Sequence, residues 1–173
     1  MSKGVFFKKL REFLVTGFFV GYIPFFPGMF GTLMGAGIYV LLSEYAYVYY
    51  PVTALLLIIA FPLSDYAEKH IFKETNSPHI VIDEIVGFMV AMTSFPFIAK
   101  WGGPVDSVTL SSIKFLVIGI ILFRVFDSWK PFPIKRALNI GGGAGIVLDD
   151  LIAAVYTNIM LQFLRIFDSQ FHY

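Results

Sequence analysis

Long apolar segments alternate with short groups of charged residues, proline and glycine along the whole chain. The longest, from Phe13 to Ser43, contains 31 residues without a charged side chain and is broken only by prolines and glycines. A membrane-spanning helix needs about 20 consecutive, mostly apolar residues, and most of the segments approach that length. We therefore predict a helix over 5–23, a Pro/Gly turn over 24–31, and spans over 32–49, 51–66, 81–99, 111–127 and 144–166.

The first predicted helix is basic at its start and apolar afterwards. Lys8, Lys9 and Arg11 precede its apolar run, as in a secretory signal peptide, but no small-residue cleavage site follows. An interfacial or re-entrant helix is the preferred interpretation.

The composition indicates that these apolar helices belong to a membrane protein. Apolar and aromatic residues make up 57% of the 173 residues and charged residues only 14%, whereas a soluble domain carries about 25% charged residues. This excludes soluble, disordered and coiled-coil proteins. We predict a single-domain (1–173), all-α, polytopic helical integral membrane protein with about four to five membrane-embedded spans plus the N-terminal interfacial or re-entrant helix.

Two further counts exclude whole classes of chemistry and partner. Cysteine is absent, which excludes disulfides, zinc–thiolate sites and cysteine nucleophiles. The net charge of +1 gives no general attraction to nucleic acid, so no nucleic-acid partner is expected.

The basic residues gather on one side of the predicted topology. If the first helix dips into the membrane and returns, the N terminus shares a side with the loops over 65–80 and 124–143. That side carries ten of the thirteen basic residues, namely Lys3, Lys8, Lys9, Arg11, Lys69, Lys73, Arg124, Lys130, Lys135 and Arg136. The positive-inside rule then makes this face cytoplasmic.

Acidic residues converge on the same face from three predicted spans. Asp83 and Glu84 open the third span, Asp127 closes the fourth, and Asp149 and Asp150 open the fifth. Carboxylates at a membrane boundary are costly unless they are paired, solvated or bound to metal. Hard oxygen ligands of this kind suit Mg²⁺, which also takes phosphate oxygens. A favourable interaction with a helix N-terminus would explain Asp83 alone or Asp150 alone, but not five acids on three helices.

Cations next to these acids suggest phosphate binding. Asp127 and Lys130 are three residues apart and could simply pair across a helical turn, which ends at Pro131. Beside a metal site, however, Arg124, Lys130 and Arg136 are suited to bind phosphate.

A glycine-rich run and one histidine leave alternatives open. The run over 141–145 precedes a helix that we expect to begin near Asp149, and it could cradle phosphate or be a flexible turn. His79 lies four residues before Asp83, but a loop-exposed histidine is the preferred interpretation.

Four ordered sequence blocks resemble one known family, the phosphatidylglycerophosphatase A family. They are GYIPFFPGMFGTL (21–33), PHIVIDEIVGFMV (78–90), FRVFDSWKPFPIKR (123–136) and GGGAGIVLDDLIAAVY (141–156), within a resemblance that extends over roughly 17–158. The resemblance implies a Mg²⁺-dependent membrane phosphatase that converts phosphatidylglycerol phosphate to phosphatidylglycerol and inorganic phosphate. It also implies a multi-pass protein of the bacterial cytoplasmic membrane, surrounded by membrane lipid, with its active site on the cytoplasmic face.

Carried over by matching motif, the resemblance assigns the acidic residues. Asp83 and Glu84 match the IVxDE block, and Asp149 and Asp150 match the acidic pair of the last block; these four would hold the metal. Asp127, in the FDxWKPxP block, would act as a base or orient the neighbouring lysine. A covalent aspartyl-phosphate and direct attack by water both remain open.

The same comparison assigns the substrate-binding residues. Lys130, Arg124 or Arg136 would neutralise charge on the phosphoryl oxygens. The first block departs from the common PGTxGS pattern, because Met29 replaces a hydroxyl residue and Thr32 stands where serine is usual. Thr32 therefore keeps a hydroxyl for substrate binding, whereas position 29 does not.

A membrane transporter or channel that binds a cation through clustered acids is the alternative function. It predicts acids near the middle of the spans. Acids at helix ends beside lysine and arginine favour the phosphatase.

Overall fold

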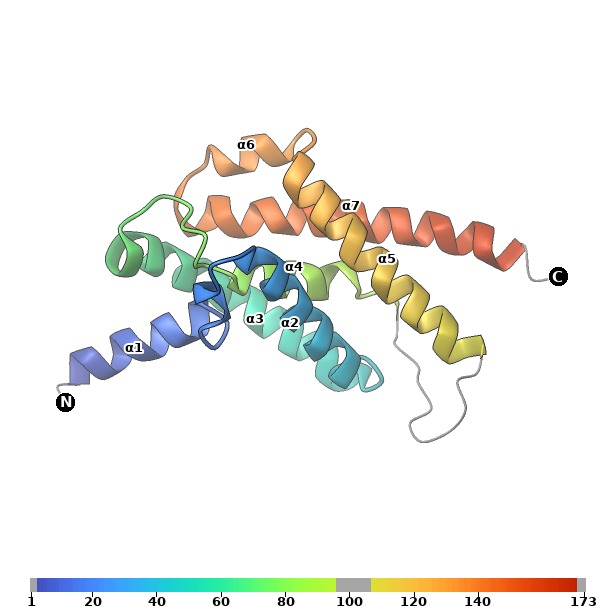
Figure 1. The fold of residues 1–173 in the computed structure, drawn as a ribbon, viewed down its shortest axis with the longest axis horizontal. Helices are drawn as coiled ribbons and strands as arrows, with labels where there is room; N and C mark the ends of the chain where they lie inside the picture. The colour runs from blue at the N-terminus through green and yellow to red at the C-terminus, as the bar shows by residue number, and fades with distance from the viewer. Residues whose placement is uncertain (1–2, 96–106, 171–173) are drawn as a thin grey trace.

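The structure is a computed structural model that describes residues 3–95 and 107–170, and these contain helices and turns but no β-strand. The predicted all-α fold is confirmed. In chain order the elements are α1 (Lys3–Val15), the 3-10 turn η1 (Val20–Tyr22), α2 (Pro27–Leu42), α3 (Ala46–Tyr66), the π-helical η2 (Ala67–Phe72), α4 (Ile82–Ala91), α5 (Ser107–Trp129), α6 (Ile134–Leu138) and α7 (Gly142–Gln170). Figure 1 shows the N terminus, η2 and the start of α7 toward one end of the long axis and the C terminus at the other.

Three helices in the described part of the chain are long and apolar enough to cross a membrane. They cover Ala46–Phe72, Thr109–Trp129 and Gly142–Asp168, and the shorter Pro27–Leu42 is also apolar. Pro51 lies in the second turn of α3, not the first, because the helix already begins at Ala46. These helices agree with the predicted polytopic helical membrane protein.

The predicted third span is shorter than expected. Helix α4 ends at Ala91, and the N–H of Met92 donates to the carbonyls of both Phe88 and Met89, which tightens the last turn. Residues 96–99 of the predicted span lie outside the described residues. With ten residues, α4 is too short to cross a membrane alone.

The predicted first helix also ends early, at Val15 instead of residue 23. Thr16 terminates it, because its hydroxyl donates to the carbonyl of Glu12 (2.8 Å) and accepts from the N–H of Phe19 (3.2 Å). Gly17 then takes a φ of 54°, a left-handed conformation that glycine adopts without strain. The end of α1 is fixed to the start of α4, since the N–H of Val81 donates to the carbonyl of Val15 (3.1 Å).

Helix α4 lies at the centre of the fold, in contact with α2, α3, α5 and α7. Two glycines permit the close approach. A Cβ at Gly35 of α2 would lie 2.6 Å from the carbonyl oxygen of Ile85, and one at Gly87 of α4 would lie 3.0 Å from both Asp150 Cβ and Phe123 Cζ. Residues of α5 and α7 are thereby brought directly against the first turns of α4.

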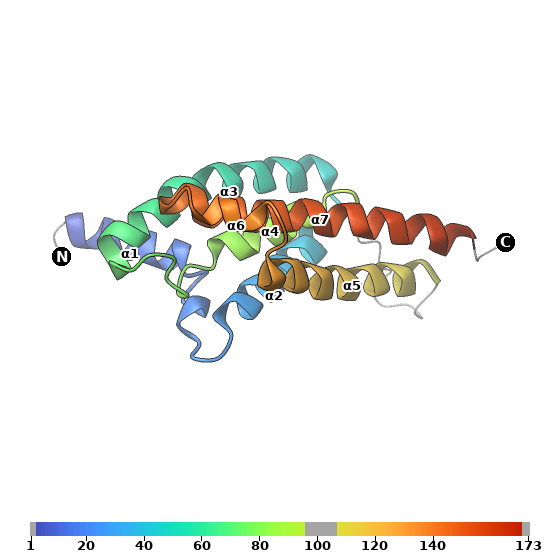
Figure 2. The same cartoon turned by 90° about the horizontal axis from the view of Figure 1, so that it is seen from above.

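Glycine is also required where α7 packs on α3, which explains Gly143 in the glycine-rich run. Helix α7 begins at Gly142, earlier than expected, and the N–H of Gly143 donates to Asp65 Oδ1 (3.3 Å). A carboxylate of the protein therefore already occupies this helix N-terminus, which argues against a phosphate cradle. Figure 2 shows α7 between α3 and α5.

Gly143→Ala should destabilise the fold by about 1–3 kcal/mol, since overpacking a close backbone contact forces a shift. The added Cβ would lie 2.3 Å from both the amide nitrogen of Asp65 and the carbonyl oxygen of Phe61. Gly37→Ala in α2 is the matched control, because its Cβ would meet nothing within 4 Å. Thermal unfolding in detergent should show a lower Tm for Gly143→Ala only; equal Tm values would contradict the close contact.

Candidate active site

Three helices bring five carboxylates together near the start of α4. Asp83 and Glu84 lie in its first turn, where acidic side chains interact favourably with the helix dipole. Asp127 comes from the last turn of α5. Asp149 and Asp150 lie in the third turn of α7, not at its start as predicted, so the dipole of that helix does not account for them.

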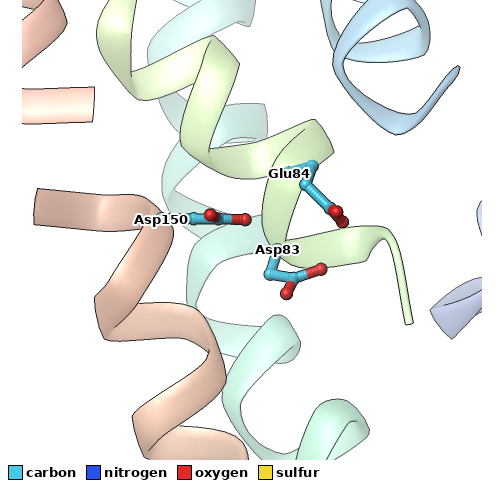
Figure 3. A group of neighbouring side chains, drawn as sticks. All are labelled: Asp83, Glu84 and Asp150. Carbon is cyan, nitrogen blue, oxygen red and sulfur yellow. The ribbon is translucent and has the colours of Figure 1, made fainter. Parts of the chain in front are cut away.

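The carboxylates form two groups that share Asp150. Oxygens of Asp83, Glu84 and Asp150 lie within 4.8 Å of one another, and so do those of Asp127, Asp149 and Asp150. Figure 3 shows the first group, with Asp150 extending from α7 toward the two acids of α4. We call these five residues the carboxylate cluster, and either group has the oxygen donors to hold a metal ion.

Most of the cluster is shielded from solvent, and several of its oxygens lack a hydrogen-bond partner. Asp83, Asp149 and Asp150 are only 8%, 5% and 3% exposed. Among the described residues, one oxygen each of Asp83, Glu84, Asp149 and Asp150 is buried without a hydrogen-bond partner. Burying an unpaired carboxylate costs several kcal/mol or more, and a bound cation would offset that cost. The residues present therefore fit a metal ion.

Two cations flank the cluster on the side of α5. Arg124 Nη1 lies 3.0 Å from Asp127 Oδ2, and Lys130 Nζ pairs with Asp149 Oδ2 and lies 4.0 Å from Asp127 Oδ1. Burial lowers the pKa of Lys130, but the hydrogen bond and attraction to Asp149 outweigh burial and hold that pKa above its ordinary value. Lys130 therefore carries a positive charge at neutral pH, at the edge of the cluster.

The backbone of Lys130 is strained to reach this position. Its φ of 48° is left-handed, which costs a non-glycine residue about 1–3 kcal/mol and persists only when its surroundings hold it. The N–H of Lys130 still donates to the carbonyl of Phe126 (2.9 Å), and its ammonium is held by Asp149.

Comparison with known protein families identifies the family of this chain. The sequence model of the family described as phosphatidylglycerophosphatase A matches residues 13–165. The chain belongs to the phosphatidylglycerophosphatase A family. This confirms the resemblance and supports the predicted function, hydrolysis of the phosphate monoester of phosphatidylglycerol phosphate. The alternative of a transporter or channel gains no support.

Individual relatives agree over most of the chain. It is 27% identical to phosphatidylglycerophosphatase A of Escherichia coli K12 over 153 residues, 87% of this chain and 81% of that protein. It is 28% identical to phosphatidylglycerophosphatase A of Haemophilus influenzae over 151 residues, 86% of this chain and 84% of that protein. A Bacteroides thetaiotaomicron protein named provisionally as a phosphatidylinositol-3-phosphatase is 28% identical over 158 residues, 87% of this chain and 90% of that protein. No solved structure matches.

The predicted substrate-binding residues do not all lie at the carboxylate cluster. Arg124 and Lys130 border the cluster, whereas Arg136 is exposed and its guanidinium lies 4.7 Å over the ring of Phe132. The hydroxyl of Thr32 is buried; it donates to the carbonyl of Gly28 (3.0 Å) and accepts from Arg124 Nη1 (3.4 Å). Thr32 therefore positions Arg124.

His79 does not belong to the carboxylate cluster. The sequence predicted an exposed loop histidine, and this prediction is wrong. His79 is partly buried, and its Nδ1 lies 2.8 Å from the carbonyl oxygen of Gly21, with which it forms a hydrogen bond. A Cβ at Gly21 would lie 2.2 Å from the carbonyl oxygen of His79. This contact joins the turn before α2 to the segment before α4.

Gly28 is a site residue that the sequence did not reveal. A Cβ there would lie 2.3 Å from Glu84 Oε1, 3.2 Å from Arg124 Nη1 and 3.3 Å from Arg124 Nη2. The first turn of α2 is thus one wall of the site, against which a carboxylate and a guanidinium both lie. The signal was present only as the glycine of the PGMFGT block, whose role depends on contacts across the fold.

Gly28→Ala should lower kcat/KM about 10–100-fold, because a displacement of about 1 Å at catalytic groups costs that order. The methyl group would displace the carboxylate of Glu84 and the guanidinium of Arg124. Gly37→Ala on the same helix has open space around its Cβ and should retain wild-type activity. Equal activities in steady-state phosphate-release assays would contradict this role of Gly28.

Proposed function

We propose that the carboxylate cluster binds Mg²⁺ and is the place where the phosphate monoester of phosphatidylglycerol phosphate is hydrolysed. The observation that carries this proposal is the set of buried carboxylate oxygens without partners on α4 and α7, next to two cations and to Asp127 of α5. Asp83, Glu84 and Asp150 would hold the metal, and Asp127 with Asp149 offers a second set of ligands around the shared Asp150. A bound divalent ion would polarise the phosphoryl group and lower the pKa of a water molecule.

The protein's own residues supply the remaining chemistry. Lys130 and Arg124 neutralise negative charge on the phosphoryl oxygens, which matters most in the transition state. Asp127 lies between the two cations and fixes both, Arg124 by its direct pair and Lys130 at 4.0 Å. The hydroxyl of Thr32 also accepts from Arg124 Nη1, the nitrogen that pairs with Asp127.

The proposed site is on the cytoplasmic face of the bacterial cytoplasmic membrane. The basic N-terminal helix, η2 and the start of α7 lie toward the same end of the molecule (Figure 1). Lys8 and Lys9 of that helix and Lys69 of η2 favour the cytoplasmic side for this end. Because the chain has no cysteine, single cysteines at positions 74 and 140 report sidedness without background. Both should react with a membrane-impermeant thiol reagent only after the membrane is opened.

The function is tested by phosphate release from phosphatidylglycerol phosphate in mixed micelles, using the purified full chain. We expect release that stops when EDTA removes divalent ions and returns with added Mg²⁺. Phosphatidylinositol 3-phosphate, assayed in parallel, tests the activity named for the Bacteroides relative. Unaltered release in EDTA would contradict the metal, and no release from phosphatidylglycerol phosphate under any condition would contradict the substrate.

A further inference from the structure

A hollow adjoins the carboxylate cluster at the segment that joins α5 to α6. Its volume is about 500 Å³, and its charged lining residues are Lys130, Lys135 and Arg136, with no acid among them. Trp129 and Phe132 also line it, and these rings are 70% and 68% exposed. We call it the basic hollow; its lining suits an anion attached to an apolar group.

The segment around the basic hollow is held firmly. The hydroxyl of Tyr156 in α7 donates to the carbonyl of Phe132 (2.6 Å), and the N–H of the fully buried Ile134 donates to the carbonyl of Pro131 (2.8 Å). The Arg136 guanidinium lies over the ring of Phe132, in a cation–π contact that limits its motion. The hollow is therefore preorganised, which lowers the cost of binding.

Lys130 connects the basic hollow to the carboxylate cluster. Its ammonium pairs with Asp149 in the cluster, and the same residue lines the hollow. An anion in the hollow and a phosphate at the cluster would thus be neighbours on either side of one lysine. A substrate with two phosphate groups separated by a short bridge fits this arrangement.

We propose that the basic hollow binds the phosphodiester of the lipid substrate while the terminal phosphate monoester lies at the carboxylate cluster. This inference rests on the proposed function. Arg136 and Lys135 neutralise the phosphodiester, and the rings of Trp129 and Phe132 contact the adjoining glycerol and acyl carbons. Trp129 at the end of α5 is also where a membrane boundary is expected, because tryptophan is enriched there.

Recognition of the phosphodiester explains why Arg136 lies away from the acids. It also defines a substrate class, lipids in which a phosphomonoester and a membrane-linked phosphodiester flank a polyol. Phosphatidylglycerol phosphate and phosphatidylinositol 3-phosphate both have this pattern. Phosphatidic acid has the monoester alone, and phosphatidylglycerol has the phosphodiester alone.

The test compares these lipids with two arginine variants of the full chain. Arg136→Gln should raise KM for phosphatidylglycerol phosphate about 10-fold or more, because a hydrogen bond to a charged group is lost. Its kcat should change much less than its KM, and inhibition by phosphatidic acid, which lacks the phosphodiester, should not weaken. Inhibition by phosphatidylglycerol should weaken by a similar factor. Arg165→Gln is the matched control, since Arg165 is also exposed and lies 5.8 Å over a ring, that of Phe95.

Several results would overturn the proposal. An equal loss of affinity for phosphatidylglycerol phosphate and phosphatidic acid would place Arg136 at the monoester or in the fold, and an unchanged KM would remove it from recognition. Inhibition of the wild type by inorganic phosphate that Arg136→Gln relieves would show a free-phosphate site instead.

A binding assay keeps the basic hollow testable if the wild type releases no phosphate at all, an outcome that would contradict the proposed function. Trp129 becomes the single tryptophan in a Trp101→Phe background. Its fluorescence should respond to short-chain phosphatidylglycerol, with weaker binding after Arg136→Gln and unchanged binding after Arg165→Gln. Equal binding by all three proteins would overturn the proposal.

Discussion

Asp150→Asn should abolish phosphate release, with kcat/KM at least about 10³-fold below wild type, because metal binding and transition-state charge stabilisation are lost together. Asp150 is shared by both carboxylate groups found among the described residues, so its loss leaves each of these groups with only two acids. Its side chain is 3% exposed and has an oxygen without a partner. Asparagine has nearly the same shape but cannot supply the negative charge.

The same substitution should not harm the fold. A neutral amide is less costly to bury than an unpaired carboxylate, so without divalent ions the Tm of Asp150→Asn should equal or exceed that of the wild type. Glu74→Gln is the matched control, an exposed acid in the segment before α4, and it should retain full activity and Tm. Wild-type activity in folded Asp150→Asn would exclude the cluster as the active site.

Lys130→Gln should lower kcat about 10²–10³-fold, the usual cost of losing one group that stabilises developing negative charge. Glutamine retains hydrogen-bond donors but not the positive charge that lies between Asp149 and Asp127. Phosphate-release kinetics at saturating substrate measure this effect.

Two further variants serve as controls for the Lys130→Gln experiment. Lys9→Gln removes an exposed lysine from α1 and should have wild-type kcat. Lys130→Arg keeps the charge in a different shape and should recover part of the lost rate. Lys130→Gln with near-normal kcat would show that Lys130 serves only to pair with Asp149.

The parts of the fold that follow from local apolar patterns could be predicted from the sequence. Helices α3, α5 and α7 have long apolar runs, and the structure contains helices in those regions. Their boundaries depend on contacts that sequence spacing does not encode. Helix α1 ends at Val15 because the Thr16 hydroxyl and the backbone of Val81 intervene, and α7 starts at Gly142 because Asp65 caps it.

The candidate site was predictable in its residue types but not in its grouping. The acids of three helices were expected at one level, and the structure brings Asp83, Glu84, Asp127, Asp149 and Asp150 together. Sequence spacing could not show that Asp127 joins Asp149 and Asp150 as a ligand group. Nor could it separate Arg124, at the cluster, from Arg136, at Phe132, because the turn at Lys130 redirects the chain between them.

Direct metal binding tests the central claim, that carboxylates of α4, α5 and α7 form one cation site. Mn²⁺ suits the same oxygen ligands as Mg²⁺ and can be followed by its paramagnetic resonance signal. Titrated with Mn²⁺, the purified wild-type protein should take up the ion, and added Mg²⁺ should displace it. Asp150→Asn should lose this binding while Glu74→Gln retains it. Equal Mn²⁺ binding by wild type and Asp150→Asn would contradict the account.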